Sequence, residues 1–301
     1  MGPTGLVSVV MPVFDPHEPW LRAAVASVLG QRSCAVELVV VDDGCDEPIA
    51  DTLTGIDDER LRVVRVAHGG VSAARDAGLA ASRGRWVRYT DADDVLEAGS
   101  TARLLRLSVA AGGAIAYGAT VFCDENLRPV WTMRCRLGGR VARACLLGRF
   151  TVRLQALLFP REIAERAGGW FGGLRVSEDW DFVLRALELA DVRGERQPAV
   201  YYRRHPAGLT SHPEAGIDDV RLVVERYLDR HPEMRGTSLE RRSDAMVHAL
   251  GARIAATRGD RGAAGRHLGA AMLGDPRAIF GELRRSAPAL RARLSAAPAG
   301  E

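Results

Sequence analysis

The stretch Val36-Glu-Leu-Val-Val-Val-Asp-Asp-Gly44 decides the fold class of this chain. Its first six residues are almost continuously apolar, which is typical of a parallel strand that helices cover on both faces. Strand-like runs and helix-like periods alternate around it, in the order strand 7–13, helix 20–29, strand 61–66, helix 71–81 and strand 85–90. Units of this length predict an α/β protein with a mostly parallel sheet and right-handed crossovers.

The carboxyl ends of the four predicted strands carry the residues best suited to chemistry. Three ends are acidic and one is glycine-rich: they are 12–15, Asp42-Asp43-Gly44, His68-Gly69-Gly70 and Asp91-Ala92-Asp93-Asp94. Ligands of open parallel sheets bind beyond the carboxyl ends of the strands. We therefore expect the functional site along this edge.

Three aspartates, Asp91, Asp93 and Asp94, fall within four residues of one another. Carboxylates this close repel each other unless a cation lies between them, and two acids in one tight turn offer the oxygen ligands that Mg²⁺ or Mn²⁺ prefers. The alternative is that Asp94 caps a helix predicted over 96–110. The pair Asp42-Asp43 leaves a similar choice between binding the donors of a base or ribose and capping the next turn.

The run from His68 to Gly78 opens a helix with a glycine-rich turn. Free N–H groups at a helix start favour an anion, and Arg75 lies close enough along the helix to meet a phosphate. The run does not match the G-x-G-x-x-G dinucleotide pattern. The alternative is an alanine-rich packing helix whose arginine is paired at the surface.

The charge composition removes several classes of enzyme. All 41 basic residues are arginine, because the chain contains no lysine. This excludes a Walker-type phosphate loop, a lysine Schiff base and lysine nucleophiles. Codon usage in a GC-rich genome explains the bias most simply. The net charge of +3 is too small to indicate nucleic-acid binding.

The remaining composition predicts a soluble protein. The five cysteines show no CxxC spacing, so reduced thiols are favoured over disulfides or a zinc site. The apolar run near the N-terminus is strand-sized and has no basic region before it, which does not match a signal peptide. These features predict a cytoplasmic location.

The pattern becomes purely helical after about Pro213. We therefore expect an α/β domain over 1–212 and a helical C-terminal region over 213–301. Arginine-rich helices such as 277–293 suit two situations: packing on their own core with a solvated basic face, or lying on an anionic membrane or a partner.

Five motifs together resemble those of family 2 inverting glycosyltransferases, and they span residues 6 to about 205. They are Pro12-Val-Phe-Asp15, Val41-Asp-Asp-Gly-Cys45, 70–78, Tyr89-Thr-Asp-Ala-Asp-Asp94 and Ser177-Glu-Asp-Trp180. The resemblance implies a GT-A fold, with a Rossmann-like nucleotide-sugar-binding half (1–94), an acceptor half (95–212) and flanking helices. Asp15 and Asp76 depart from the family pattern, where Asn is usual, and Cys45 departs where Ser is usual.

The resemblance also implies a donor site that contains a divalent ion, Mn²⁺ or Mg²⁺. Its nucleotide-sugar-binding residues would be Pro12, Phe14, Asp15, Asp43, Arg75, Asp91, Ala92 and Asp93. Within this set Asp43 would bind the base, Asp93 would ligate the metal, and Asp91 would contact the ribose or the metal shell. His205 matches a position that touches the metal or diphosphate in some relatives; otherwise it is a loop histidine.

The catalytic base implied by the resemblance is Asp179, although an acid at a helix start is equally suited to capping. The acceptor side would contain Trp170, Glu178 and Trp180. The glycine-rich segment 168–173 fits either a mobile aromatic wall for a sugar face or a plain turn with two core aromatics.

The function implied by these residues is inverting, metal-dependent transfer of a sugar from a UDP- or dTDP-type donor to a hydroxyl of a glycan, glycolipid or small molecule. A sugar nucleotidyltransferase is disfavoured, because the chain lacks both its glycine-rich N-terminal loop and any lysine. A non-catalytic sugar-nucleotide-binding scaffold or sensor is the other alternative, and the presence of Asp93 and Asp179 argues against it. The C-terminal helices add two options: peripheral attachment to the inner face of the membrane, or self-association.

Overall fold

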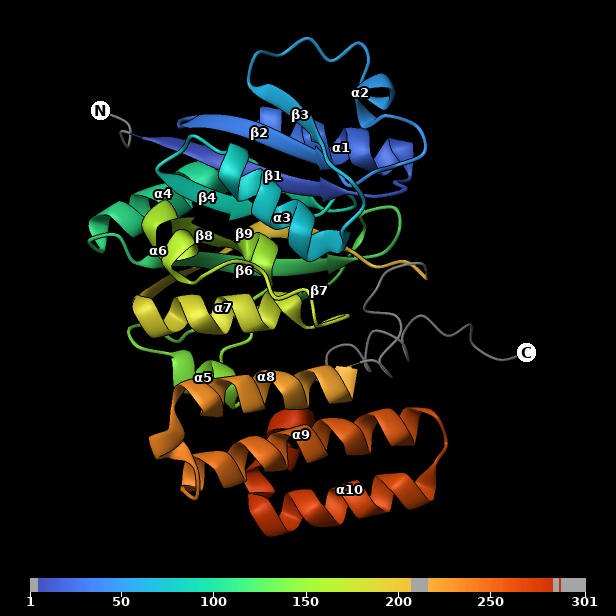
Figure 1. Ribbon diagram of the computed structural model, residues 1–301, viewed down its shortest axis with the longest axis vertical. Helices are drawn as coiled ribbons and strands as arrows, with labels where there is room; N and C mark the ends of the chain where they lie inside the picture. The colour runs from blue at the N-terminus through green and yellow to red at the C-terminus, as the bar shows by residue number, and fades with distance from the viewer. Residues whose placement is uncertain (1–4, 207–215, 284–286, 288–301) are drawn as a thin grey trace. The chain divides into compact units, whose positions relative to one another are not determined.

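The computed structural model describes residues 5–206, 216–283 and 287 (Figure 1). The chain forms two compact units. The larger comprises 1–142, 152–173 and 178–205, and the smaller comprises 143–151, 174–177 and 206–301.

A nine-stranded mixed sheet forms the centre of the larger unit (Figure 1). Its hydrogen-bonded order is β3-β2-β1-β4-β8-β6-β9-β5, and β7 pairs with β6. The first four strands are mutually parallel, as the sequence predicts: β1 (Leu6–Val13), β2 (Ala35–Asp42), β3 (Leu61–Arg65) and β4 (Trp86–Tyr89). This half is the Rossmann-like part of the fold.

The remaining strands make the other half of the sheet mixed. They are β5 (Val95–Leu96), β6 (Ile115–Cys123), β7 (Pro129–Met133), β8 (Leu157–Pro160) and β9 (Val192–Arg203). β8 is antiparallel to both β4 and β6, so it joins the two halves, whereas β6 and β9 are parallel.

Helices flank the sheet of the larger unit. They are α1 (Glu18–Leu29), α2 (Ile49–Thr52), α3 (Gly70–Ala81), α4 (Ser100–Ala110), α6 (Arg161–Arg166) and α7 (Glu178–Leu189), with a 3₁₀ turn, η1 (Leu154–Ala156). A short helix, α5 (Ala142–Leu146), follows the 1–142 segment. The helix predicted over 96–110 begins only at Ser100, because β5 and Gly99, in the left-handed region at φ 77°, come first. Asp94 therefore does not cap that helix.

Opposite faces of β1 pack against α1 and α3. Val9 and Met11 share a hydrophobic cluster with Leu21 and Val25 of α1, and alternate residues of a strand point to opposite faces. On the other face α3 comes so close that a Cβ on Gly78 would lie 2.3 Å from Cγ1 of Val10. Glycine is thus required at this point of α3.

The smaller unit contains α8 (Gly216–Arg230), the 3₁₀ turn η4 (Pro232–Met234), α9 (Ser238–Thr257) and α10 (Arg261–Gly274). The helical C-terminal region expected from the sequence is present. Asp219 of α8 accepts hydrogen bonds from the backbone N–H groups of Arg175 and Val176, which anchors the 174–177 segment within this unit. None of the described helices combines the length and the apolarity that a membrane span requires.

Candidate active site

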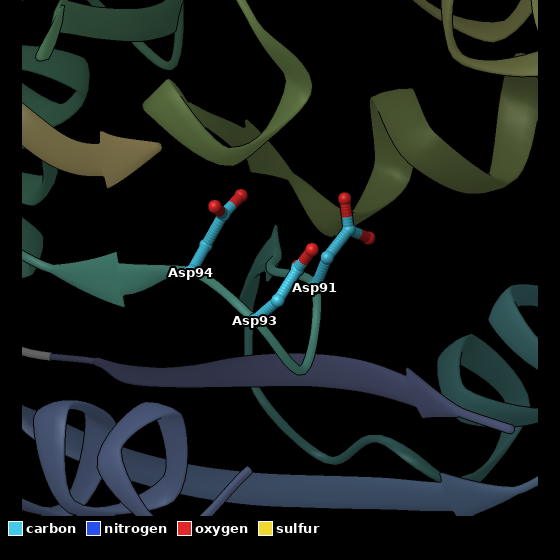
Figure 2. A group of neighbouring side chains, drawn as sticks. All are labelled: Asp91, Asp93 and Asp94. Atoms are coloured by element: carbon cyan, nitrogen blue, oxygen red, sulfur yellow. The ribbon is translucent and has the colours of Figure 1, made fainter. Parts of the chain in front are cut away.

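An acidic cluster lies on the turn between β4 and β5. Figure 2 shows Asp91, Asp93 and Asp94 on this turn, and one ligand atom from each lies within 4.8 Å of the others. Asp94 is buried, while Asp91 and Asp93 are half-buried. Ala92, between Asp91 and Asp93, is partly buried and packs against the hydrophobic core.

Burial and mutual repulsion disfavour ionisation of Asp93 and Asp94 in this cluster. Burial, and then the charge of Asp91, raise the pKa of Asp93. Burial and the charges of both neighbours raise the pKa of Asp94 still further. Within the described part of the chain, Oδ2 of Asp94 has no hydrogen-bond partner. Hard oxygen ligands gathered this closely fit a divalent cation such as Mg²⁺ or Mn²⁺.

The end of β9 braces this turn. Nε2 of His205 lies 2.9 Å from Oδ2 of Asp93, so the histidine does contact the cluster. The backbone N–H of Arg203 donates to Oδ1 of Asp94 at 2.9 Å, and its Nε donates to the carbonyl of Asp93 at 2.9 Å. The guanidinium of Arg203 and the ring of His205 both lie against Trp20.

Arg75 of α3 joins the acidic cluster to the start of α7. Its Nη2 donates to Oδ1 of Asp91 at 3.0 Å, and its Nη1 donates to Oε1 of Glu178 at 2.7 Å. Burial alone would lower the pKa of Arg75, but the charges of Asp91 and Glu178 outweigh it and raise that pKa. Arg75 is buried, so it is not the surface-paired arginine of the alternative interpretation. Both terminal nitrogens bind carboxylates of the site.

Asp179 follows Glu178 in the first turn of α7 and is half-buried. Its Oδ1 accepts a hydrogen bond from the backbone N–H of Trp180 at 2.7 Å, and its charge is one of the causes that raise the pKa of Glu178, after burial. The side chain of Trp180 is also half-buried. The Arg75 bridge therefore brings the implied base and the implied metal ligands into one site.

Trp170 faces inward. It is 6 % exposed, stacks on Phe182 with ring centroids 4.1 Å apart, and lies under the guanidinium of Arg75 at 4.6 Å. The carboxylate of Asp76 accepts a hydrogen bond from the backbone N–H of Trp170. This placement favours a turn with a core aromatic over a mobile aromatic wall at Trp170.

The ends of β1, β2 and β3 form a second cluster. The carboxylate of Asp43 accepts hydrogen bonds from the backbone N–H groups of Gly69 and Gly70, both at 2.9 Å. The anion at the start of α3 is thus Asp43 itself. A Cβ on Gly44 would lie 2.8 Å from the backbone nitrogen of His68, so glycine is needed for this close contact. By contrast, Asp42 is structural: it accepts from the backbone of the loop after β2 and from Arg65.

An exposed aromatic surface adjoins Asp43. Phe14 is 55 % exposed and stacks on His68 with ring centroids 4.3 Å apart, which suits a planar base. Asp15 is exposed beside it at a φ of 43°, in the left-handed region. Pro12 is buried in β1 and contributes to the shape of the strand end.

Gln155 of η1 was not predicted as a site residue. Its Nε2 donates a hydrogen bond to Oδ2 of Asp91. The antiparallel register of β8 on β4 places it there, and no motif marks it. The only available signal was one polar amide in the otherwise apolar run 154–159.

Known proteins resemble the chain at the level of sequence. The sequence profile described as Glycosyl transferase family 2 matches residues 8–177. The uncharacterized glycosyltransferase EpsJ of Bacillus subtilis is 28% identical over 223 residues, which are 69% of this chain and 64% of EpsJ. The O-antigen biosynthesis protein RfbC of Myxococcus xanthus is 26% identical over 258 residues, 80% of this chain and 19% of RfbC. The chain thus spans less than two thirds of the length of either relative.

A solved structure shares the fold. S. aureus TarS 1–349 in complex with UDP-GlcNAc superposes with a TM-score of 0.63 at 17% identity, covering 96% of this chain and 87% of TarS 1–349. This likeness identifies the fold as GT-A. Because the family profile covers more than half of the sequence, the chain belongs to glycosyl transferase family 2.

Proposed function

We propose that this glycosyltransferase moves a sugar from a UDP- or dTDP-type donor to an acceptor hydroxyl with inversion at the anomeric carbon. The observation that carries the proposal is the Arg75 bridge, which ties Asp91 of the acidic cluster to Glu178, the neighbour of Asp179. Support for a UDP-type donor comes from TarS, whose structures of this fold contain UDP-GlcNAc and UDP.

The donor would extend along the carboxyl ends of the strands. Phe14 and His68 would stack on the base, and Asp43 would accept hydrogen bonds from it. Asp91 and Asp93, with His205 on Asp93, would hold a divalent cation at the diphosphate. Mn²⁺ or Mg²⁺, when bound, would neutralise charge that gathers on the departing diphosphate.

Asp179 would act as the general base. The acceptor oxygen forms a bond to the anomeric carbon while the bond from that carbon to the diphosphate oxygen breaks. The hydroxyl proton goes to the carboxylate of Asp179, and the electron pair of the broken bond leaves with the nucleoside diphosphate. Glu178 and Trp180 would flank the acceptor, whereas the role of Trp170 would be to support Arg75.

Two measurements test this function. Thermal-shift screening of nucleotide sugars with MnCl₂ identifies the donor, and release of nucleoside diphosphate reports turnover. Asp179→Asn should keep donor binding and lose about 10²- to 10⁴-fold in transfer. Asp218→Asn, at an exposed first-turn acid of α8, is the matched control and should change neither.

The outcomes separate the alternatives. Transfer retained by Asp179→Asn would show that another group is the base. Nucleotide-sugar binding without turnover, across a broad panel of acceptors, would favour the scaffold or sensor. Absence of binding to any nucleoside diphosphate would exclude both.

We also propose that the smaller unit attaches the enzyme to the anionic inner face of a membrane. Five large apolar side chains are exposed within residues 268–283: Leu268, Met272, Leu273, Phe280 and Leu283. The first three lie on α10, where Arg261 and Arg266 are also exposed and which contains no acidic residue. The nearby acids Asp275 and Glu282 are already paired with Arg242 and Arg253. Of the segment 277–293, residues 284–286 and 288–293 lie outside the described residues.

Vesicle sedimentation tests the membrane proposal. The enzyme should sediment with phosphatidylglycerol vesicles and not with phosphatidylcholine alone. Leu273→Ser/Phe280→Ser should abolish this, while Val130→Ser, at an exposed apolar residue of β7, should not. Self-association through the same surface would instead give concentration-dependent sedimentation without vesicles that the double variant removes.

A further inference from the structure

The position of Gln155 follows from the register of β8. In this antiparallel pair Trp86 lies opposite Pro160 and Val87 opposite Phe159. Continued by four residues, this register brings Gln155 opposite Asp91, and the hydrogen bond from Nε2 to Oδ2 of Asp91 joins them. Gln155 therefore lies at the catalytic edge of the sheet, one strand beyond the acidic cluster.

The order of strands in the sheet orders the groups along this edge. From β3 through β2 and β1 come His68, Asp43 and Phe14, then the acidic cluster after β4, and then Gln155 beside β8. A nucleoside diphosphate sugar has the order base, ribose, diphosphate, sugar. With the base on Phe14 and His68 and the diphosphate at the acidic cluster, the group next in line is the sugar.

Gln155 has an unused acceptor. The residue is 5 % exposed, and its Oε1 is buried without a hydrogen-bond partner among the described residues. A buried carbonyl oxygen without a donor is costly, and binding a hydroxyl there removes that cost. A sugar ring supplies such hydroxyls, whereas the diphosphate offers only acceptors.

Arg88 holds Gln155 rigidly in place. The guanidinium of Arg88 is fully buried. Its Nε and Nη2 both donate to the backbone carbonyl of Gln155, at 3.2 and 3.0 Å. Its remaining donors bind Ser100, Thr101 and the carbonyl of Ala199. Arg88 thus fixes the backbone of Gln155, and the hydrogen bond to Asp91 holds its side-chain amide, so the amide is positioned before any ligand arrives, as a specificity contact requires.

We infer that Gln155 binds the donor sugar: Oε1 accepts a hydrogen bond from a ring hydroxyl, while Nε2 holds Asp91. The inference rests on the proposed function, because it assumes a nucleotide-sugar donor. It makes Gln155 a residue that distinguishes the sugar-bearing donor from the bare nucleotide.

Isothermal titration calorimetry in MnCl₂ tests the inference with two probes. One is UDP. The other is whichever of UDP-GlcNAc, UDP-glucose and UDP-galactose gives the largest thermal shift. Gln155→Met keeps the size of the side chain and removes both polar groups. It should raise the Kd of the UDP-sugar about tenfold and leave the Kd of UDP within about twofold. Gln155→Leu, which also removes Oε1 without adding a charge, provides a second variant if the first folds poorly, and it should weaken binding of the UDP-sugar at least as much.

Gln31→Met is the matched control. Gln31 is 2 % exposed, and its amide binds the backbone of Ser27, Glu97 and Thr101 away from the site. It should lower the melting temperature without changing the ratio of the two Kd values. Equal weakening of UDP and UDP-sugar in both Gln155 variants, or no weakening, would overturn the inference and leave the proposed function intact. Failure of the wild-type enzyme to bind any nucleotide probe would overturn both.

Discussion

Arg75 donates from one buried guanidinium to Asp91 and to Glu178. A fork of planar N–H groups can engage two carboxylates at once, whereas a lysine offers one compact charge. The residue thus organises the acids of the site.

Replacing Arg75 by Met should destabilise the enzyme by about 3 kcal/mol, the low end for a broken buried pair, because the Asp91 carboxylate is 32% exposed. Arg75→Lys should recover only part of the lost folding free energy, and it should bind the nucleotide-sugar donor more weakly than the wild type does. Urea denaturation and nucleotide titration measure the two effects. Arg103→Met, which removes a similar bridge between Glu97 and Glu195 outside the site, should reduce stability but not donor binding. Unchanged donor affinity in Arg75→Met would contradict this role.

Single residues were predictable where a strand end displays them. Asp43 follows a long apolar run and Asp93 follows the shorter strand-like run 85–90, so the place of both at the edge of the sheet was expected from the order of strands and helices. Gln155 was not predictable, because its place depends on an antiparallel register between segments about 65 residues apart. The pairing of Arg75 with Glu178 is similarly invisible, since it joins α3 to α7 across 103 residues.

At the scale of the elements, one buried side chain supports η1. Arg88 links η1 to α4 and β9 through its five hydrogen bonds to neutral oxygens and has no carboxylate among these partners. Burial, and then the charge of Arg103, lower the pKa of Arg88 to about 9. Burial opposes the charged form of Arg88. The hydrogen bonds from its N–H groups to these oxygens offset that cost and keep the side chain protonated.

Arg88→Met should cost about 3 kcal/mol of folding free energy, because several buried oxygens lose their donor together. The variant should also weaken binding of the nucleotide sugar more than binding of the bare nucleotide, because Arg88 no longer holds Gln155 in place. Chemical denaturation and titration with UDP and a UDP-sugar check the two parts. A variant as stable as wild type would show that neighbouring groups or water replace the guanidinium.

Helices α9 and α10 meet at a histidine pair, with the two Nδ1 atoms of His248 and His267 3.0 Å apart. Burial lowers the pKa of His248 from 6.5, and the charges of His267 and Arg221 add to this, while Asp244 opposes it. A histidine with a lowered folded pKa binds its proton more weakly when folded. Its contribution to stability is therefore complete above pH 6.5 and is lost as the pH falls below that value.

The melting temperature should fall between pH 7.5 and pH 5.5 by about 2 °C more in wild type than in His248→Gln. Burial also raises the pKa of Asp244, whose protonation favours the folded chain and acts in the opposite direction at lower pH. Comparing the two proteins at each pH isolates the histidine. His17→Gln, at an exposed position, should follow wild type. Equal pH dependence in His248→Gln and wild type would rule out this pair as the source.

Elements were predictable in proportion to their length. The four parallel strands and the C-terminal helices carry enough residues for their periods to be evident. β5 has two residues, too few for a period, so this strand and the late start of α4 appear only in the structure.

At the scale of the whole molecule, the absence of lysine leaves few cations for the leaving diphosphate. Arg75 is bound to two carboxylates, and Nε of Arg203 is bound to the carbonyl of Asp93. Neutralisation should therefore depend on the metal. Treatment with EDTA should reduce transfer at least about 100-fold, and MnCl₂ should restore it.

Nucleotide binding in the same samples provides a readout independent of turnover. UDP affinity should fall in EDTA for the wild type, and Asp93→Asn should bind UDP weakly with or without metal. Full activity in EDTA would contradict a metal requirement and would assign the charge to arginines alone.

The close approach of α3 to β1 at Gly78 has a consequence for how this enzyme can vary. Arg75 lies one turn before Gly78 on the same helix, so the height of α3 above the sheet also sets the reach of Arg75 to Asp91. Any side chain at position 78 would lift the helix and lengthen that reach. Selection for catalysis therefore acts on a residue inside the core. The first effect of a substitution at Gly78 would be a lower affinity for the nucleotide-sugar donor.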